Sequence, residues 1–175
     1  MRRLVLLAAL LAIGACAQLE TKAPQDVEFD LSGRLAARYG KQAFSGNIAW
    51  RHARSADELL ITSSLGAGIA RIVREGDSVV LTTAEPREYK ARDAEALTEE
   101  VLGFRLPLAG LADWVRGRPS DKSGAKAEHD ADGRLRLLEE RGWKIEYQEY
   151  EGKLPSRMRL TYPDIELRLA ISKWE

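Results

Sequence analysis

Apolar and polar residues alternate along most of this chain, and this alternation limits the fold more than any other feature. Odd-numbered positions are apolar or small in residues 31–39, and even-numbered positions are so in residues 44–51. Because successive side chains of a β-strand point to opposite faces, each segment has one apolar and one polar face. The sequence predicts two antiparallel strands, joined by a hairpin turn at residues 40–42.

The same alternation returns on both sides of a central interruption. Before it, strands are predicted over residues 58–63, 68–74 and 78–83. After it, strands are predicted around Leu135 and Leu137 and over residues 143–148, 157–162 and 165–172. The pattern predicts a mainly β protein of roughly ten or eleven antiparallel strands.

The interruption itself, at about residues 93–117, has a helical period. Asp93 is a suitable N-cap for a helix over residues 94–102, and Gly103 suits the end of that helix. A second helix is predicted over residues 108–116. The apolar faces of both helices must pack on another element, so we expect them to cover the sheet as a lid.

The alternation alone leaves open how the sheet closes. Strands with one apolar face form either a sandwich or a barrel. A barrel of eight strands just holds a small ligand, so a barrel with more strands has a larger interior. That interior must be kept open for a ligand or be filled. The length of 175 residues suits a single domain in either case.

Composition excludes several classes of function. The 27 basic and 27 acidic residues balance, whereas binding to nucleic acid phosphates requires a basic surplus. One Cys and two His form neither an internal disulfide nor a His/Cys zinc site. Gly66 and Gly68 are not followed by the Lys-Ser or Lys-Thr of a phosphate-binding loop. We therefore expect no metal and no cofactor.

The N-terminus has the features of a bacterial lipoprotein signal peptide. Two arginines precede an apolar run over residues 4–13, which is about half the length needed to cross a bilayer. Residues 13–16 then read Ile-Gly-Ala-Cys, which resembles a lipobox, in which the cysteine thiol accepts diacylglycerol. An ordinary cleavage site at residues 15–17 is the alternative. The lipobox is favoured because Cys16 has no internal partner for a disulfide.

Short motifs in a fixed order resemble the family of the outer-membrane lipoprotein receptor LolB. Their order and spacing, rather than any single motif, carry the resemblance over residues 31–174. The most distinctive run is Leu-Gly at 102–103, Leu-Pro-Leu at 106–108, and then Trp114, Gly117 and Pro119. Further matches are Gly33-Arg34-Leu35, residues 59–66, Asp93-Ala94-Glu95, Gly133-Arg134-Leu135, residues 142–147 and residues 167–174.

The resemblance implies an unclosed antiparallel β-barrel with a helical lid over an apolar cavity. The cavity would receive the acyl chains of triacylated lipoproteins from the soluble periplasmic carrier LolA, and the protein would insert them into the outer membrane. The resemblance also implies that the protein is not an enzyme. We expect a monomer at the outer membrane that faces the periplasm and is anchored by lipid on Cys16. Ala17, rather than Asp, after the cysteine agrees with that location.

We therefore predict three parts of the chain. Residues 1–15 are a signal peptide that is removed, residues 16–30 form the lipidated N-terminus and a tether, and residues 31–175 form one lipoprotein-binding domain. The residues expected to line the acyl-chain cavity are Leu35, Ile48, Trp50, Leu97, Leu102, Leu108, Leu111, Trp114, Ile145, Tyr147, Leu160, Leu167 and Leu169.

Leu65 lies in a predicted turn between two strands. The family usually has Pro-Leu-Gly at this place, and its exposed leucine promotes the insertion of lipoproteins into the membrane. Ser64 replaces the proline here, which predicts a less rigid loop. Small polar neighbours favour an exposed tip, although a turn residue tucked against the core is the alternative. An exposed leucine would gain about 1.5–3 kcal/mol on entering lipid.

The remaining polar residues give weak signals. His52 and His129 are expected on the solvated surface. Glu139, Glu140 and residues 149–151 are expected there too, with docking of the carrier as the alternative. For the four tryptophans, a place in the core and a place at the rim of the cavity are equally expected.

Three other functions remain open at this point. Ser63 can be combined with His52 and Asp57 into a catalytic triad, but no nucleophile elbow supports a hydrolase. A structural lipoprotein that scaffolds an outer-membrane complex is the second alternative. A general lipid-binding lipoprotein, without a role in lipoprotein sorting, is the third.

Overall fold

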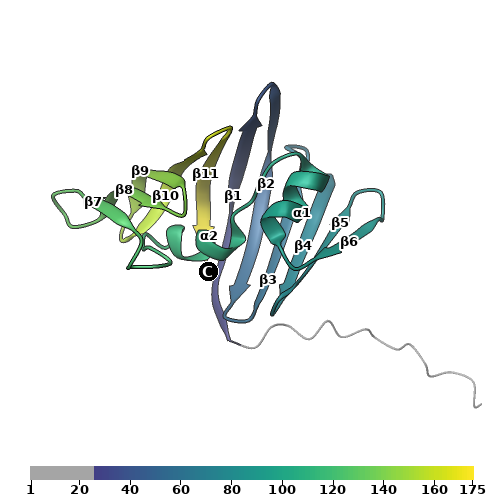
Figure 1. Ribbon diagram of the computed structural model, residues 1–175, viewed down its shortest axis with the longest axis horizontal. Coiled ribbons are helices and arrows are strands. Elements are labelled where there is room, and N and C mark those ends of the chain that lie inside the picture. Colours follow the sequence, from purple (N-terminus) through teal and green to yellow (C-terminus); the bar gives the residue numbers. More distant parts are fainter. Residues whose placement is uncertain (1–25) are drawn as a thin grey trace, which may run out of the picture.

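A computed structural model describes residues 26–175 and contains one large antiparallel sheet with two helices (Figure 1). The first half of the chain forms β1 (Val27–Tyr39), β2 (Gln42–Ala53), β3 (Ala56–Thr62), β4 (Gly68–Glu75), β5 (Ser78–Thr83) and β6 (Glu88–Ala91). The rest forms α1 (Ala94–Leu102), α2 (Leu108–Trp114), β7 (Lys126–His129), β8 (Leu135–Glu140), β9 (Trp143–Glu151), β10 (Leu154–Tyr162) and β11 (Ile165–Trp174). The prediction of a mainly β protein with a helical insertion is confirmed.

The first and last strands lie side by side in the middle of the sheet. The strand order is β6-β5-β4-β3-β2-β1-β11-β10-β9-β8-β7, and Leu35 of β1 is opposite Leu169 of β11. The edge strands β6 and β7 do not pair with each other, so the sheet is an unclosed barrel of eleven strands, as predicted. Two halves of the chain are thus joined along the β1–β11 pair.

Two strands lie in segments that carried no sequence signal. β7 is exposed at all four positions and β6 alternates only between exposed and half-buried residues, so neither has an apolar face. β1 begins at Val27, four residues before the predicted start of the domain at residue 31. Phe29 explains this difference, because its ring is buried against Trp50 and His52, with centroid distances of 5.0 and 4.8 Å. Residues 27–30 of the predicted tether therefore belong to the sheet.

Both helices lie on one face of the sheet (Figure 1). Helix α1 has the predicted bounds, and the carboxylate of Asp93 caps it by accepting hydrogen bonds from the backbone N–H groups of Glu95 and Ala96. Gly103 ends this helix with a φ of 76°, a conformation that favours glycine. Helix α2 ends at Trp114, two residues earlier than predicted. Neither helix in the described range 26–175 is long and apolar enough to cross a membrane.

Candidate functional site

One apolar core lies between the helices and the sheet, and it contains the residues predicted to line a cavity. Twelve of these thirteen are buried, with at most 6% of their surface exposed, while Leu102 is half-buried and packs against the same core. Open space beside a side chain would leave it accessible to water-sized molecules. The interior around these residues is therefore filled by side chains in this conformation, and the open space expected from the sequence is not present there.

The filled interior has a simple physical cause. Apolar surface in contact with water costs about 25 cal/mol per Å², and protein interiors pack as densely as organic crystals. An apolar space without a ligand is therefore unfavourable unless rigid elements hold it open. Here the helices close over the sheet. Trp50, Trp114 and Trp143 are buried with them, whereas Trp174 is half-buried near the end of β11.

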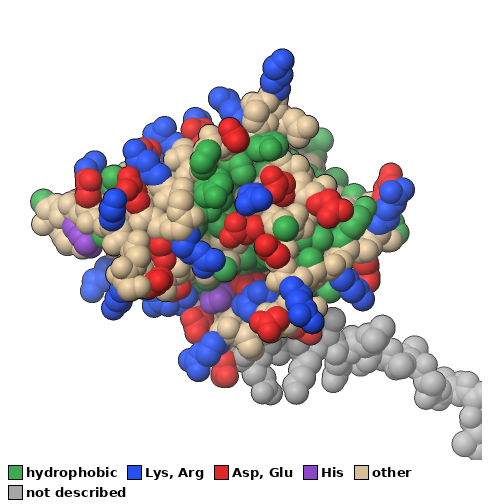
Figure 2. All heavy atoms as spheres, viewed as in Figure 1, with side chains coloured by type: hydrophobic (Ala, Val, Ile, Leu, Met, Phe, Trp, Pro, Cys, Tyr) green, Lys and Arg blue, Asp and Glu red, His purple; other side chains and the backbone are tan. Residues whose placement is uncertain are grey.

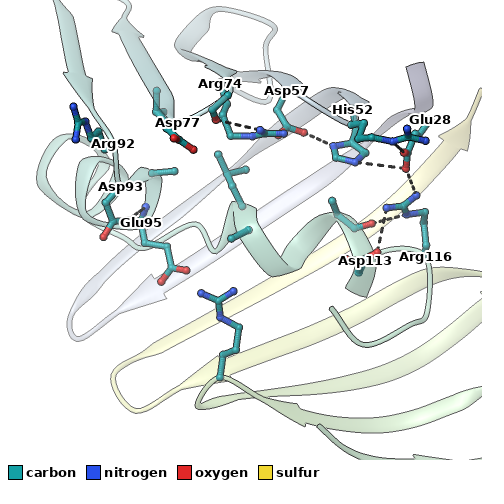
Figure 3. A pocket seen from close by; sticks show the side chains of 18 of the residues that line it. Glu28, His52, Asp57, Arg74, Asp77, Arg92, Asp93, Glu95, Asp113 and Arg116 are labelled. Atoms are coloured by element: carbon teal, nitrogen blue, oxygen red, sulfur yellow. Dashed lines mark hydrogen bonds and ion pairs between the residues drawn. The ribbon is translucent and has the colours of Figure 1, made fainter. Parts of the chain in front are cut away.

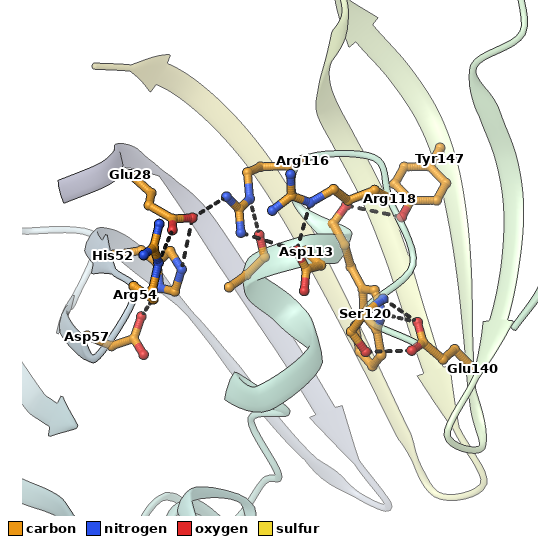
Figure 4. A network of polar contacts seen from close by, with 12 residues as sticks. Glu28, His52, Arg54, Asp57, Asp113, Arg116, Arg118, Ser120, Glu140 and Tyr147 are labelled. Carbon is orange, nitrogen blue, oxygen red and sulfur yellow. Dashed lines mark hydrogen bonds and ion pairs between the residues drawn. The ribbon is translucent and has the colours of Figure 1, made fainter. Parts of the chain in front are cut away.

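Helix α2 is attached to β8 through a buried carboxylate, that of Glu140. Its side chain accepts a hydrogen bond of 2.7 Å from the indole N–H of Trp114. It also accepts hydrogen bonds from the backbone N–H groups of Ser120 and Asp121, at 3.0 and 2.6 Å (Figure 4). Burial alone would raise the pKa of Glu140, but these bonds and that from the Ser120 hydroxyl outweigh it and lower the pKa.

The burial of Glu140 corrects its predicted place on the solvated surface. The pairing of β7 with β8 is irregular: Glu128 lies opposite Leu137, but the next residue of β7 lies opposite Leu135, so the register shifts there. The shift changes which residues of β8 face the core, so Leu138 and Glu140 point inward. A simple period of two through Leu135 and Leu137 would have placed Glu140 outside. His129 is exposed, as expected.

A cleft with a volume of about 730 Å³ lies beside the apolar core (Figure 3). We call it the charged cleft because most of the residues that line it are charged. Its walls come from the ends of β1 to β5, from both helices and from the turn between β8 and β9. The acidic residues lining it are Glu28, Asp57, Asp77, Asp93, Glu95 and Asp113. The basic residues lining it are Arg54, Arg74, Arg92, Arg116, Arg118 and Arg141. The charges of the cleft therefore balance.

Asp57 is the buried centre of one wall of this cleft. It accepts hydrogen bonds of 2.9 Å from the indole N–H of Trp50 and 2.5 Å from Nε of Arg74. Nδ1 of His52 lies 2.6 Å from the same carboxylate. Burial favours a raised pKa for Asp57, but the hydrogen bonds from His52 and Trp50 and the charge of Arg74 outweigh it and lower the pKa.

His52 is buried, with 7% of its surface exposed, although the sequence predicted a solvated histidine. The signal was present in the sequence, because His52 continues the even-numbered inward positions of Ile48 and Trp50 on β2. The buried carboxylate of Asp57 supplies the partner that makes this burial possible.

A second part of the cleft connects β1 to the end of α2. Arg116 donates a hydrogen bond of 2.6 Å to the carboxylate of Glu28 and one of 2.7 Å to the backbone carbonyl of Ala112 (Figure 4). Its guanidinium group lies 5.3 Å from the centroid of the Phe29 ring. The hydrogen bond from Arg116 is the main cause of a lowered pKa for Glu28. Helix α2 is thus held at its C-terminal end by the sheet.

The catalytic triad considered from the sequence is excluded by the geometry. His52 and Asp57 are in contact, but Ser63 lies six residues further along β3 and beyond its far end, about 20 Å away at ~3.3 Å per residue. The Ser63 hydroxyl instead accepts a hydrogen bond of 3.1 Å from the backbone N–H of Ala67. Within residues 26–175, no three His, Cys, Asp or Glu side chains are grouped to hold a metal ion.

The family described as "Outer membrane lipoprotein LolB" matches residues 27–174. The chain belongs to the LolB family. An outer-membrane lipoprotein LolB of Nitrosomonas europaea is 39% identical over 153 residues, which cover 84% of this chain and 72% of that protein. An outer-membrane lipoprotein LolB of Thiobacillus denitrificans is 35% identical over 183 residues, which cover 100% of this chain and 98% of that protein.

A solved structure of a LolA superfamily protein from Nitrosomonas europaea is also similar to this chain. It has a TM-score of 0.48 and 11% sequence identity, with 87% of each chain covered.

In this LolB-family chain, the Leu-Pro-Leu run at 106–108 connects the two helices. Leu106 is fully buried, and its backbone N–H donates a hydrogen bond of 2.9 Å to the hydroxyl of Thr98 on α1. Figure 2 shows hydrophobic side chains gathered beside α1, over β1 and β2. The distinctive motif of the resemblance thus forms the junction between α1 and α2.

The loop after β3 carries Leu65, the residue predicted to act in membrane insertion. Leu65 is 96% exposed, and Gly66 has a φ of 88°, which places it in the left-handed region. The Ser63 carbonyl accepts a hydrogen bond of 2.9 Å from the N–H of Gly66, so the loop is a tight turn. The predicted exposure of the leucine at the tip agrees with this geometry. Its role in insertion stays a prediction, as does lipidation of Cys16, which lies outside the described residues.

Proposed function

We propose that this chain accepts lipoproteins from the carrier LolA, holds their acyl chains in its apolar interior and inserts them into the outer membrane. The observation that carries the proposal is the match of residues 27–174 to the LolB family, whose relatives are named outer-membrane lipoproteins. The continuous apolar core under two helices supports it, because acyl chains need an apolar site.

The energetics of transfer require the interior to open. Each buried methylene is worth about 0.8 kcal/mol, so release of a triacylated client into water costs tens of kcal/mol. The acyl chains must therefore pass directly from the carrier to this protein and then to the membrane. Because the interior is filled here, entry requires the helices to move and the acyl chains to replace contacts made by Leu97, Leu108 and Leu111.

Leu65 is proposed to start the delivery step. Its side chain is almost fully exposed, so it has little packing to lose, while entry into lipid gains about 1.5–3 kcal/mol. The small and polar neighbours Ser63, Ser64 and Gly66 leave the leucine as the apolar tip of the loop. Contact of this tip with the bilayer would hold the protein where acyl chains can leave it.

Cys16 is proposed to carry the lipid anchor after removal of residues 1–15, with a monomer facing the periplasm. Two or three acyl chains give stable membrane attachment, whereas one chain gives reversible attachment. The variant Cys16→Ala is expected to keep its fold and to leave the membrane fraction. Fractionation of cells into membrane and soluble parts measures this, and an unchanged membrane fraction would contradict the anchor.

The decisive experiment is transfer of a lipoprotein from loaded LolA to this protein and then to vesicles. We expect Leu65→Glu to accept the lipoprotein normally and to fail in delivery, because a charge resists entry into hydrocarbon. Leu60→Glu is the matched control, since Leu60 is an exposed leucine on the β3 strand itself, 42% accessible. Equal loss of acceptance and delivery in Leu65→Glu would show that the leucine supports the fold instead.

The filled interior also suits a structural lipoprotein that scaffolds a membrane complex. The same purified domain separates the two functions. If it takes up no acyl chains from loaded LolA or from a fluorescent fatty acid, the scaffold is favoured. If it binds fatty acids but refuses lipoproteins, a general lipid-binding function replaces the proposed one.

A further inference from the structure

The charged cleft meets the apolar core at α2 and β5. Leu108 and Ala112 of α2 and Val79 of β5 line the cleft and belong to the buried core as well. On the same side, Ala94 and Glu95 bring in the first turn of α1 (Figure 3). A molecule with an apolar part and a polar part would find both environments in contact here.

A client lipoprotein is such a molecule, if the proposed function holds. Its acyl chains are attached to its first residue, and a polypeptide follows directly. When the acyl chains lie in the core, the first peptide groups must leave through the boundary of the core. Backbone N–H and C=O groups cost several kcal/mol when they lose water without gaining hydrogen bonds. The exit for the peptide therefore needs polar partners close to the apolar core.

The cleft supplies such partners of both charges. The carboxylate of Asp93 is used as the cap of α1. Among the other charged residues lining the cleft within residues 26–175, Arg92 and Arg141 have no carboxylate within ion-pair distance, and Asp77 and Glu95 have no cation within it. These four groups are available to a ligand as two cations and two anions. The wall that contains Asp57 is fixed, because the carboxylate of Asp57 is hydrogen-bonded to three neighbouring side chains. A pre-formed wall reduces the entropy lost on binding.

We propose that the charged cleft binds the polypeptide segment that follows the acylated cysteine of a client lipoprotein. This inference rests on the proposed function and adds a second subsite to it. The balanced charges favour a peptide over an anionic lipid headgroup, which would require a positive surplus. They also allow segments of different sequence to bind, since neither sign of charge is excluded. Its volume of about 730 Å³ is in the range of sites for small ligands.

Ala109 offers a variant that blocks the cleft without changing the core. It lies on the exposed side of α2 and lines the cleft, so Ala109→Trp fills the space with a large side chain. Ala127→Trp is the matched control, because Ala127 is exposed on the edge strand β7 and lies outside the lining of the cleft. Arg92→Ser with Arg141→Ser is the second variant, which removes the two unpaired cations.

The test compares two synthetic probes: a triacylated cysteine followed by a short acidic peptide, and the triacylated cysteine alone. Affinities are measured by fluorescence with the purified mature protein. We expect Ala109→Trp to weaken binding of the peptide-bearing probe about tenfold or more, and to leave binding of the cysteine probe within about twofold. The double arginine variant should weaken the same probe selectively, and Ala127→Trp should affect neither.

Two results would overturn the inference. Equal weakening of both probes would make the cleft an entry path for acyl chains, and unchanged affinities in both cleft variants would show that the peptide leaves elsewhere. If the wild-type protein binds neither probe, the proposed function itself fails. This failure can be told apart from failure of the inference about the cleft, because it is seen with the wild-type protein before any variant is compared.

Discussion

The two helices cover the same face of one sheet, but they are attached to it in different ways. Helix α2 is joined to β8 by the bond from Trp114 to Glu140, and Arg116, two residues after its end, is bonded to Glu28 of β1. It therefore connects both halves of the sheet. Helix α1 contacts β5 and β6 near one edge, and the hydroxyl of Thr98 links it to the segment that leads into α2.

This difference indicates which part of the lid opens more easily. Movement of α2 would expose Trp114 and leave the buried carboxylate of Glu140 without its indole partner. Hydrogen bonds to charged groups are worth about 1.5–3 kcal/mol each. Movement of α1 breaks a hydrogen bond between neutral groups and the ion pair of Glu99 with Arg105, whose side chains are about one third exposed, and it exposes the side chain of Leu97. We expect α1 to be the element that moves when acyl chains enter.

The largest effect is expected from Trp114→Ala. It removes a buried ring from the core and the indole donor from Glu140, so we expect unfolding to become easier by about 3–5 kcal/mol. Leu97→Ala makes the corresponding change in α1 and should cost about 2 kcal/mol. Denaturant unfolding of both variants measures the difference. Equal losses would contradict the unequal attachment of the helices.

Glu140→Ala tests the bond between α2 and β8 more directly. The indole of Trp114 and the N–H groups of Ser120 and Asp121 would lose their acceptor, at about 1–3 kcal/mol for an unsatisfied buried group. Glu139→Ala is the control from the adjacent exposed position and should stay within about 0.5 kcal/mol of the wild type. Hydrogen exchange should increase in α2, and a change confined to α1 would refute this assignment.

The pKa values of Glu140 and Asp57 are both lowered in the folded protein. Carboxylates with a lowered folded pKa stabilise the fold fully above their unfolded pKa values, which are about 4.3 and 3.9. This stabilisation is lost as the pH falls through the folded pKa values. We expect the free energy of unfolding to decrease below about pH 5, and Glu140→Gln to reduce this decrease. An unchanged acid profile in that variant would contradict the role of Glu140.

A smaller effect is expected from Thr98→Val, which keeps the shape of the side chain. The backbone N–H of Leu106 would lose its acceptor, with an expected cost of about 1–2 kcal/mol. Thr98→Ser keeps the hydroxyl and serves as the control. Hydrogen exchange should rise in α1 while α2 stays protected. An equal rise in both helices would mean that they move as one body.

The smallest effect is expected from Asp93→Ala, which removes the N-cap of α1. Loss of this cap costs about 1 kcal/mol, whereas Asp93→Asn keeps an acceptor and should be nearly neutral. Because the cap stabilises α1 alone, the variant should also raise uptake of a fluorescent fatty acid. Reduced uptake would show that an intact α1 is needed for binding.

Local patterns in the sequence predicted much of this fold. Alternation located most strands, and the pair Asp93 and Gly103 gave the bounds of α1 correctly. The prediction was wrong for His52 and Glu140, and it missed β6 and β7. The edge strands have little or no buried face, so no alternation marks them. Glu140 was misplaced because a register shift in β8 reverses the faces of the strand.

The sequence by itself determined most of the strands, the helical insertion and the exposed tip at Leu65, because each depends on residues close together in the chain. It also indicated the family, through the order of short motifs along residues 31–174. Only the tertiary structure decided that the interior is filled, that a charged cleft adjoins it, and which carboxylates are buried. The partners of those carboxylates are distant in sequence: Arg74 is 17 residues from Asp57, and Glu140 is 26 residues from Trp114. The first contact forms when β3 and β4 pair, and the second forms when α2 packs against β8.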